Sequence, residues 1–407
     1  MTIYLKEKRT VSIKQLMFAV LILPFFPPML VEMMVEKGSA LWKVIEYCYK
    51  GSQVVFASFG YVIWLCDKKR ESSRWFIFLV AHLFSFVVAC AANGTISPSL
   101  MGRMYSDIGF CILCVVLLKN SRKDFIGACV MLFTLLTVYG ILSIYLFPRG
   151  FFNGETVYDR VWGLGAKNNA FPMFFACFFF NFLNYMEQDK SIPNTMPVYI
   201  TMAIIAGMVC ESVNTMLCLA LVLFVYFLNR FLPRILTCVN FRVVLIAFIF
   251  ILAVIYVGMK SKLMVTILAM LGRSPTFSGR TRLWEQAITY LRNNPLFGAG
   301  HMLEYFLGSG ISTPHAHSQW MDKLAKYGSV QFVFLILFVS KTFKNGCKCP
   351  TRRKACVIMS LLLIYMLHMS FDTYNYDFFT LFFICANAVF VNDRNCWKDN
   401  KVSASNL

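Results

Sequence analysis

The chain has 407 residues, of which 58% are hydrophobic and 14% charged, and its formal net charge is +19. This composition excludes an ordinary soluble globular protein, whose surface needs far more Lys, Glu and Asp. It also argues against a nucleic-acid-binding protein, because no soluble domain carries a basic stripe interleaved with aromatic residues, and excess Lys and Arg in membrane proteins set topology. Repeated apolar runs of roughly 17–25 residues instead predict an all-α polytopic integral membrane protein.

About twelve apolar runs along the chain are expected to form membrane-spanning helices. They are 15–33, 51–66, 75–93, 106–118, 125–147, 169–186, 196–210, 213–228, 243–259, 329–342, 355–371 and 378–392. The seventh and eighth runs are short, and Glu211-Ser212 joins them. We therefore expect one polytopic membrane domain over residues 1–407.

The distribution of Lys and Arg predicts which connections lie inside the cell. Clusters such as Lys68-Lys69-Arg70 and Arg352-Arg353-Lys354 fall in connections of one side, whereas the connections 95–105 and 372–377 on the other side are nearly free of them. Because short cytoplasmic loops collect Lys and Arg, both termini are predicted to be cytoplasmic. Residues 260–328, between the ninth and tenth runs, then form a large extracytoplasmic loop, since long loops translocate largely regardless of charge.

The segment 148–168 is predicted to be a second extracytoplasmic connection. It contains the basic residues Arg149, Arg160 and Lys167. Gly163 and Gly165 allow a sharp turn or a close approach of the backbone to a ligand. This segment is therefore a candidate part of a binding site.

The first half of the long loop predicts an amphipathic helix at the membrane surface. Apolar residues recur at helical spacing from Leu283 to Leu291, and the pattern ends at Asn293-Asn294-Pro295. Ser278 or Thr276 can cap this helix, which places Arg280 and Arg282 in its first turn. Guanidinium groups beside free backbone N–H groups make an anion site suited to phosphate. The alternative is that both arginines only extend to lipid headgroups.

The second half of the loop contains the candidate general base. A flexible glycine-rich stretch follows Gly298, and Thr313-Pro314 is expected to start a helix that runs through His315 and His317 to Gly328. A histidine near a helix N-terminus stays neutral near pH 7, as a general base must. The alternatives are a hydrogen-bonded histidine without a catalytic role and a metal ligand. No Cys or carboxylate accompanies the two histidines, so we expect no metal site.

These residue types favour group transfer from a lipid-linked diphosphate. Such a donor carries its own leaving group, so the reaction can proceed outside the membrane without ATP or nucleotide sugars. Arginines would stabilise the departing diphosphate, and a neutral histidine would accept the proton of an acceptor hydroxyl. Neither a metal ion nor another cofactor is required if guanidinium groups carry this charge.

Three motifs resemble the bacterial O-antigen ligase and polysaccharide polymerase superfamily. The first is Ser278-Gly279-Arg280 with Trp284 four residues on, followed by Asn294-Pro295-Leu296-Phe297-Gly298 and Gly300. The second is His317-Ser318 followed by Gly328, and the third combines Arg160, Gly163 and Asn168-Asn169 ahead of a span. The similarity is strongest over 278–328 and 158–172, and the layout of about twelve spans agrees over the whole chain.

The resemblance implies a metal-independent glycosyltransferase of GT-C-like architecture in the bacterial cytoplasmic (inner) membrane. Its donor would be an undecaprenyl-diphosphate-linked oligosaccharide, and residues 260–328 would be its catalytic loop. His317 matches the proposed base, and Arg160 and Arg280 match the diphosphate-binding arginines. Arg282 is a third predicted diphosphate-binding arginine, although it lies beside the motif positions and carries less weight. His315 and Asn169 are candidate supporting residues. The chain departs from the family where Ser212 is followed by Val213, because the family often has Ser-Arg there.

The leading functional hypothesis is a repeat-unit polymerase for capsule, exopolysaccharide or O antigen. The alternatives are a ligase that transfers the finished glycan to lipid A core or another acceptor, and a transporter or flippase of lipid-linked sugars. Expected partners are membrane lipid, a flippase and a chain-length regulator, but no nucleic acid. The connection 371–377 mixes carboxylates with aromatic residues. It suits either sugar binding or an interfacial aromatic belt, and no catalytic role is predicted for it.

Overall fold

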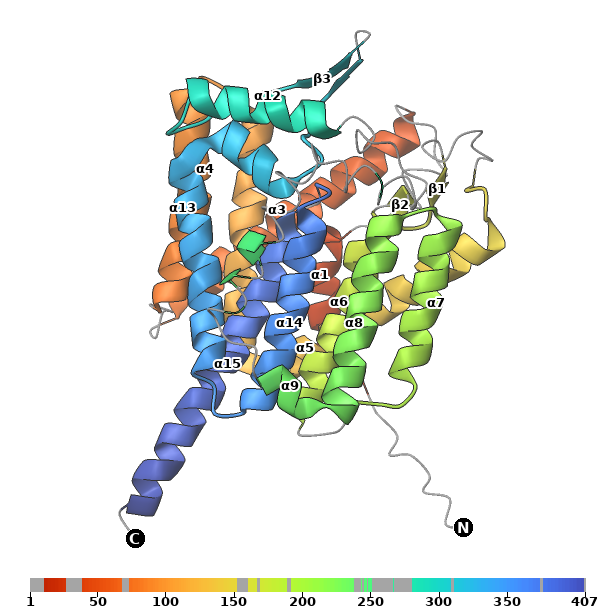
Figure 1. Ribbon diagram of the computed structural model, residues 1–407. Coiled ribbons are helices and arrows are strands. Elements are labelled where there is room, and N and C mark those ends of the chain that lie inside the picture. Colours follow the sequence, from red (N-terminus) through yellow and green to blue (C-terminus); the bar gives the residue numbers. More distant parts are fainter. Residues whose placement is uncertain are drawn as a thin grey trace.

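The computed structural model describes residues 11–26, 39–67, 73–151, 160–166, 169–188, 192–237, 280–308, 311–373 and 376–405, with isolated positions between 243 and 266. The described chain forms a bundle of helices (Figure 1). Its helices are α1 Ile13–Ile22, η1 Leu23–Phe25, α3 Ala40–Cys66, α4 Arg74–Ala92, α5 Pro98–Leu146, α6 Ala170–Glu187, α7 Met196–Val209, α8 Val213–Phe231, α9 Pro233–Thr237, α12 Arg280–Asn293, α13 Gln319–Cys347, α14 Arg352–Met369 and α15 Tyr376–Ser405. Two antiparallel hairpins complete it, β1 Val161–Trp162 with β2 Gly165–Ala166, and β3 Tyr305–Gly308 with β4 Ile311–Thr313.

The helices have the length and composition of a polytopic membrane protein. Among the described residues, four helices (α4, α5, α8 and α13) are long and apolar enough to cross a bilayer, and shorter apolar helices accompany them. The predicted class of a mostly helical membrane protein is therefore confirmed. The number of about twelve spans and the orientation of the loops stay predictions. The predicted span 243–259 and the loop residues 260–279 lie outside the described residues, apart from isolated positions.

Two predicted boundaries differ from the structure because helices continue across them. The fourth and fifth predicted spans form the single element α5, which is broken only at Ser121, where φ is −153° and ψ is 62°. The tenth predicted span is likewise the second part of α13, which bends at Gly328. The stretch after Gly298 that was expected to be flexible instead contains the β3–β4 hairpin.

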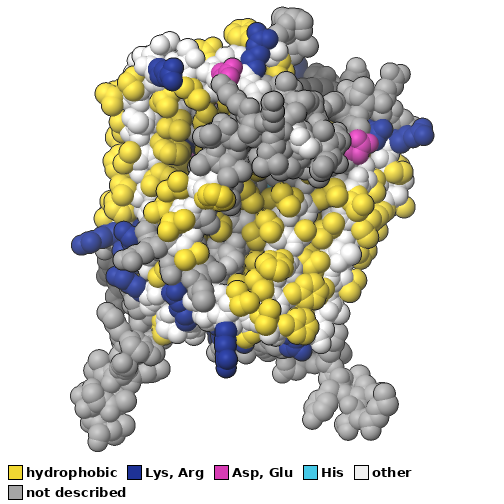
Figure 2. Space-filling model, in the orientation of Figure 1, with side chains coloured by type: hydrophobic (Ala, Val, Ile, Leu, Met, Phe, Trp, Pro, Cys, Tyr) yellow, Lys and Arg dark blue, Asp and Glu magenta, His cyan; other side chains and the backbone are white. Residues whose placement is uncertain are grey.

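Aromatic side chains form the centre of the bundle. Helix α6 is buried along nearly its whole length, and Phe175 packs against Tyr365 of α14 and Phe382 of α15, with ring centroids 5.1 and 5.2 Å apart. The outer helices expose large apolar side chains such as Leu135 and Phe224. Figure 2 shows hydrophobic side chains over the middle of one face, with Lys and Arg along its lower part. Such a surface is favourable where lipid covers it.

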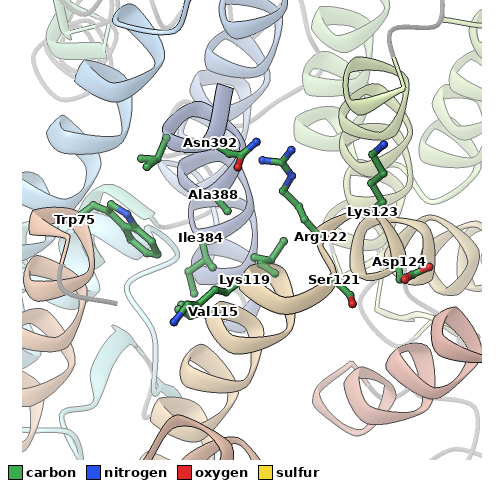
Figure 3. Close-up of a pocket in the computed structure, with 12 residues that line it drawn as sticks. Trp75, Val115, Lys119, Ser121, Arg122, Lys123, Asp124, Ile384, Ala388 and Asn392 are labelled. Carbon is green, nitrogen blue, oxygen red and sulfur yellow. The ribbon is translucent and has the colours of Figure 1, made fainter. Parts of the chain in front are cut away.

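A cavity of about 530 Å³ lies at the break in α5. It is enclosed by the start of α4, the two parts of α5 and the middle of α15 (Figure 3). At its mouth, Arg122 points toward Asn392 and forms an ion pair with Glu187, with Nη2 2.9 Å from the carboxylate. None of the predicted site residues lines this cavity. The charges at its mouth join α5 to α6, so we assign them a structural role.

Four helix ends meet where the predicted site residues lie. The Asn214 side chain at the start of α8 donates to the carbonyl of His368 near the end of α14, at 3.3 Å. The ring of His368 stacks on Phe171 at the start of α6, with centroids 3.6 Å apart. Trp320 at the start of α13 donates from its indole to Ser370 Oγ at 3.1 Å. These contacts bring the ends of α6, α8, α13 and α14 together, and α12 lies across the same end of the bundle (Figure 1).

Candidate active site

Asp372, in the connection between α14 and α15, is the centre of the candidate active site. Its Oδ1 lies 3.8 Å from Nδ1 of His317, and its Oδ2 lies 3.9 Å from Nη2 of Arg280. The carboxylate is almost fully buried, with 8% of the side chain exposed, whereas the His317 side chain is 40% exposed. A buried carboxylate therefore brings together two of the predicted site residues and leaves the imidazole accessible from outside.

The surroundings of Asp372 keep it ionised. Burial alone would raise the pKa of this carboxyl group, because a charged form loses hydration. His317 and the Arg280 guanidinium outweigh burial and hold the pKa of Asp372 below its ordinary value of 3.8. The site therefore contains a permanent negative charge between an imidazole and a guanidinium group at neutral pH.

His317 does not lie in a helix, and the predicted helix start at Thr313-Pro314 is wrong. Strand β4 ends at Thr313, and α13 begins at Gln319 after the N-cap residue Ser318. His317 has a φ of +50°, in the left-handed region that L residues rarely adopt. The backbone N–H of Gln319 donates to the carbonyl oxygen of Asp372 at 3.2 Å, which ties the start of α13 to the connection that carries the carboxylate.

The glycines of the sequence motifs let two segments dock against each other. The N–H groups of Ala299 and Gly300 donate to carbonyls of Ala325 and Lys326 on α13, at 2.8 and 2.9 Å. A Cβ at Gly328 would lie 2.2 Å from the carbonyl oxygen of Leu296, and φ there is +75°. Only glycine fits such a close approach with positive φ. The spacing between His317 and Gly328 therefore corresponds to the first part of α13, which separates the imidazole from this docking point.

Gly298 has the same role on the other side of the contact. A Cβ at this position would lie 2.4 Å from the Lys326 carbonyl carbon, and φ is +66°. The segment that follows Asn294-Pro295 therefore packs directly against the backbone of α13 near Lys326.

Helix α12 confirms the predicted amphipathic helix and separates the two arginines of its first turn. Leu283, Trp284 and Ala287 form its buried face. Arg280 faces Asp372, with only 19% of its side chain exposed. Arg282 instead donates from Nη1 to the carbonyl of Leu307 in β3, at 3.3 Å. The structure thus directs Arg280 to the candidate site and Arg282 to the neighbouring hairpin.

Arg160 reaches the same end of the bundle from the second predicted extracytoplasmic connection. Its Nη1 lies 3.5 Å from Oε1 of Glu211, at the junction of α7 and α8. Its Nε is buried and has no hydrogen-bond partner within the described part of the chain. Three residues beyond Glu211, Asn214 contacts the carbonyl of His368. Arg160 therefore contacts the junction of α7 and α8, and its convergence with Arg280 and His317 stays a prediction.

The remaining predicted residues lie at the edge of the site. Asn169 is exposed directly before α6, two residues from the Phe171 ring that stacks on His368. His315 is exposed, and its Nδ1 lies 4.0 Å from Oδ2 of Asp322. In the described ranges, no group of three or more His, Cys, Asp or Glu side chains is placed to hold a metal ion.

Sequence reasoning missed Asp372, although a signal for it was present. The connection 371–377 was interpreted only as a sugar-binding segment or an aromatic belt. Its carboxylates follow a long apolar span in a chain with only 20 acidic residues. Acidic residues this rare, placed directly after a span and next to aromatic residues, were the available signal.

Residues 198–336 match the family model described as O-antigen ligase. This match supports the resemblance of the chain to the O-antigen ligase and polymerase superfamily. Members of this superfamily are glycosyltransferase-like enzymes of the ligase or polymerase type. No curated protein matches the chain.

The part that matches the O-antigen ligase family runs from α7 into the second part of α13. It includes Arg280, His317 and the docking glycines Gly298 and Gly328. Arg160 and Asp372 lie outside it, on either side. The O-antigen ligase region thus contains the imidazole and the guanidinium group that lie beside Asp372, and a flanking part of the chain contains the carboxylate.

Proposed function

We propose that this protein is a polysaccharide repeat-unit polymerase at the outer face of the bacterial cytoplasmic membrane. It transfers the growing glycan from undecaprenyl diphosphate to the non-reducing end of a lipid-linked repeat unit. The observation that supports this proposal most directly is the arrangement of His317 and Arg280 on the two oxygens of the buried Asp372 carboxylate. It combines an accessible base with a cation suited to phosphate at one end of an apolar bundle.

The proposed reaction forms one glycosidic bond and breaks one bond to phosphate. The acceptor hydroxyl oxygen attacks the anomeric carbon of the donor, and the bond from this carbon to the diphosphate oxygen breaks. The proton of the hydroxyl passes to Nε2 of His317, because Nδ1 faces Asp372. The carboxylate then stabilises the imidazolium ion. A positioned general base of this kind contributes about 10²–10⁴-fold to the rate.

The arginines stabilise the leaving group in this proposal. A guanidinium has five N–H donors, so a contact of 3.9 Å to Asp372 leaves most of the Arg280 donors for a diphosphate. Arg160 adds a second guanidinium from the side of α8, next to Glu211. Two guanidinium groups offset the negative charge that develops as the diphosphate departs. Arg282 is not included, because its guanidinium donates to β3.

A ligase is the second candidate, favoured by the description of the matching family. It would use the same donor chemistry and transfer the finished glycan to lipid A core or another acceptor. The same side chains, Arg280, Asp372 and His317, would serve either reaction. Only the acceptor distinguishes the polymerase from the ligase. A transporter fits less well, because these ionisable groups gather at the end of the bundle rather than at its middle.

Surface glycan from a deletion strain tests the proposal. Loss of polymer with single repeat units remaining supports the polymerase, and accumulation of lipid-linked polymer supports the ligase. Vesicles containing the purified protein and a labelled lipid-linked repeat unit provide the second test. Translocation of the labelled unit without elongation would overturn both enzymatic candidates.

A further inference from the structure

The backbone conformation at His317 needs support from its surroundings. A left-handed conformation at a residue with a Cβ costs about 1–2 kcal/mol, and such a conformation persists only where neighbouring groups enforce it. His317, with a φ of +50°, is one of only two non-glycine residues with positive φ in the described part of the chain. Its neighbours on the N-terminal side, residues 314–316, receive such support from three side chains.

The three residues 314–316, here called the 314–316 segment, are held at three points. Lys326 Nζ donates to the carbonyl oxygen of Pro314 at 2.5 Å. The N–H of Ala316 donates to Oδ1 of Asp322 at 3.2 Å, and its carbonyl oxygen accepts from the indole of Trp284 at 2.8 Å. Ala316 itself is fully buried. The backbone directly before His317 is therefore fixed by two side chains of α13 and one of α12.

Asp322 and Lys326 also form an ion pair with each other. Lys326 Nζ lies 3.1 Å from Oδ2 of Asp322, one helical turn away, and the two side chains are only 4% and 9% exposed. A buried ion pair gains little stability over apolar residues of similar size, because removing both charges from water is costly. Its geometry offers another explanation: each partner directs one further hydrogen bond to the 314–316 segment.

We propose that Asp322 and Lys326 are positioning residues for His317. They hold the 314–316 segment, and thereby the left-handed conformation that turns the imidazole toward Asp372. This inference rests on the proposed role of His317 as the base. Asp322 and Lys326 touch the backbone of the segment and act on the reaction only through His317.

The proposal predicts a loss in turnover rather than in binding. Without the ion pair, the 314–316 segment relaxes and the imidazole loses its alignment with the acceptor hydroxyl. A displacement of about 1 Å costs about 10²-fold in rate. The arginines proposed to bind the diphosphate lie on elements other than α13, so donor KM stays close to that of the wild type.

The experiment measures elongation of a labelled lipid-linked repeat unit by purified full-length protein in vesicles. The variants are Asp322→Ala, Asp322→Asn and Trp284→Phe, and kcat is expressed per folded molecule from gel filtration and thermal unfolding. We expect a loss of about 10²-fold in kcat for Asp322→Ala, with donor KM unchanged. Asp322→Asn should lose less, because its side-chain oxygen still accepts from Ala316. Trp284→Phe keeps an aromatic ring but removes the indole N–H that donates to Ala316, and should also lower kcat.

Lys323→Met is the matched control on the same helix. Lys323 is as buried as Asp322, but its ammonium lies over the rings of Phe86 and Tyr327, 5.9 and 5.4 Å from their centroids. This variant should keep kcat even if its thermal stability falls. If Lys323→Met and Asp322→Asn lose kcat to the same extent, the positioning role is wrong. The loss would then come from a general disturbance of α13.

A parallel His317→Ala measurement separates this inference from the proposed function. If His317→Ala retains its kcat, the assignment of the base is wrong, and the positioning role is lost with it. If His317→Ala is inactive while Asp322→Asn and Trp284→Phe have the wild-type kcat, only the positioning role is wrong. Should Asp322→Ala fail to fold, the other two variants still decide the outcome.

Discussion

Nδ1 of His317 lies 3.8 Å from Oδ1 of Asp372, and the carbonyl of the same aspartate accepts from the N–H of Gln319 at 3.2 Å. One residue thus contacts both the imidazole and the first turn of the helix that follows it. This double contact fixes the distance between the base and the carboxylate even though His317 precedes α13. The arrangement gives Nδ1 a charged partner and leaves Nε2 for the substrate.

Replacement of His317 by Ala should abolish polymer formation. Removal of the base should lower the rate of elongation about 10²–10⁴-fold, because no other group would take the proton of the acceptor hydroxyl. The measurement is surface glycan from a strain that carries only the variant. Full-length polymer in this strain, with normal expression and membrane insertion, would contradict the assignment.

The two arginines of α12 should respond differently to replacement by Lys. Arg280→Lys should be severe, since a single ammonium cannot reproduce a bidentate contact to phosphate. We expect a loss of about 10²-fold in elongation rate, the size of a lost charge-stabilising contact. Arg282→Lys should be mild, because Arg282 donates to the carbonyl of Leu307 and not to the candidate site among the described residues. A near-normal rate for Arg280→Lys would contradict the role of Arg280 at the diphosphate.

The class of a helical membrane protein was predictable, because apolar runs of bilayer length indicate it from the sequence alone. The amphipathic helix α12 and the glycines Gly298 and Gly328 were found in the sequence from spacing and resemblance. The left-handed conformation of His317 was not, since it depends on hydrogen bonds from side chains on two other elements. The role of Asp372 was also hidden: its two partners are distant in sequence, and only packing of α12, α13 and the α14–α15 connection brings them together.

Asp372→Asn should change both activity and the pH dependence of stability. Loss of the carboxylate removes the charge that stabilises the imidazolium ion, and we expect a fall of about 10²-fold or more in kcat. The folded-state pKa of Asp372 lies below 3.8, so the ionised group stabilises the folded state above that value. This contribution is lost as the pH falls through the folded-state pKa.

Thermal unfolding of purified protein between about pH 2 and 5 measures this contribution. The wild type should lose stability toward acid more steeply than Asp372→Asn, which has no titrating group at this position. Parallel curves for the two proteins would show that Asp372 has no depressed pKa. Retained activity in the variant would in addition remove the carboxylate from the proposed mechanism.

Gly328→Ala should prevent correct docking of α13 on the loop that precedes it. The added Cβ would lie 2.2 Å from the carbonyl oxygen of Leu296 at a φ of +75°, and a backbone oxygen cannot move aside as a flexible side chain can. We expect a loss of several kcal/mol in unfolding free energy, since overpacking and left-handed strain add to each other, each costing about 1–3 kcal/mol.

Gly51→Ala is the control, because a Cβ there meets nothing within 4 Å in the middle of α3. Alanine should stabilise that helix by about 0.5–1 kcal/mol. Thermal unfolding in detergent compares the two variants, and a Gly328→Ala protein as stable as Gly51→Ala would contradict the docking role of the glycine.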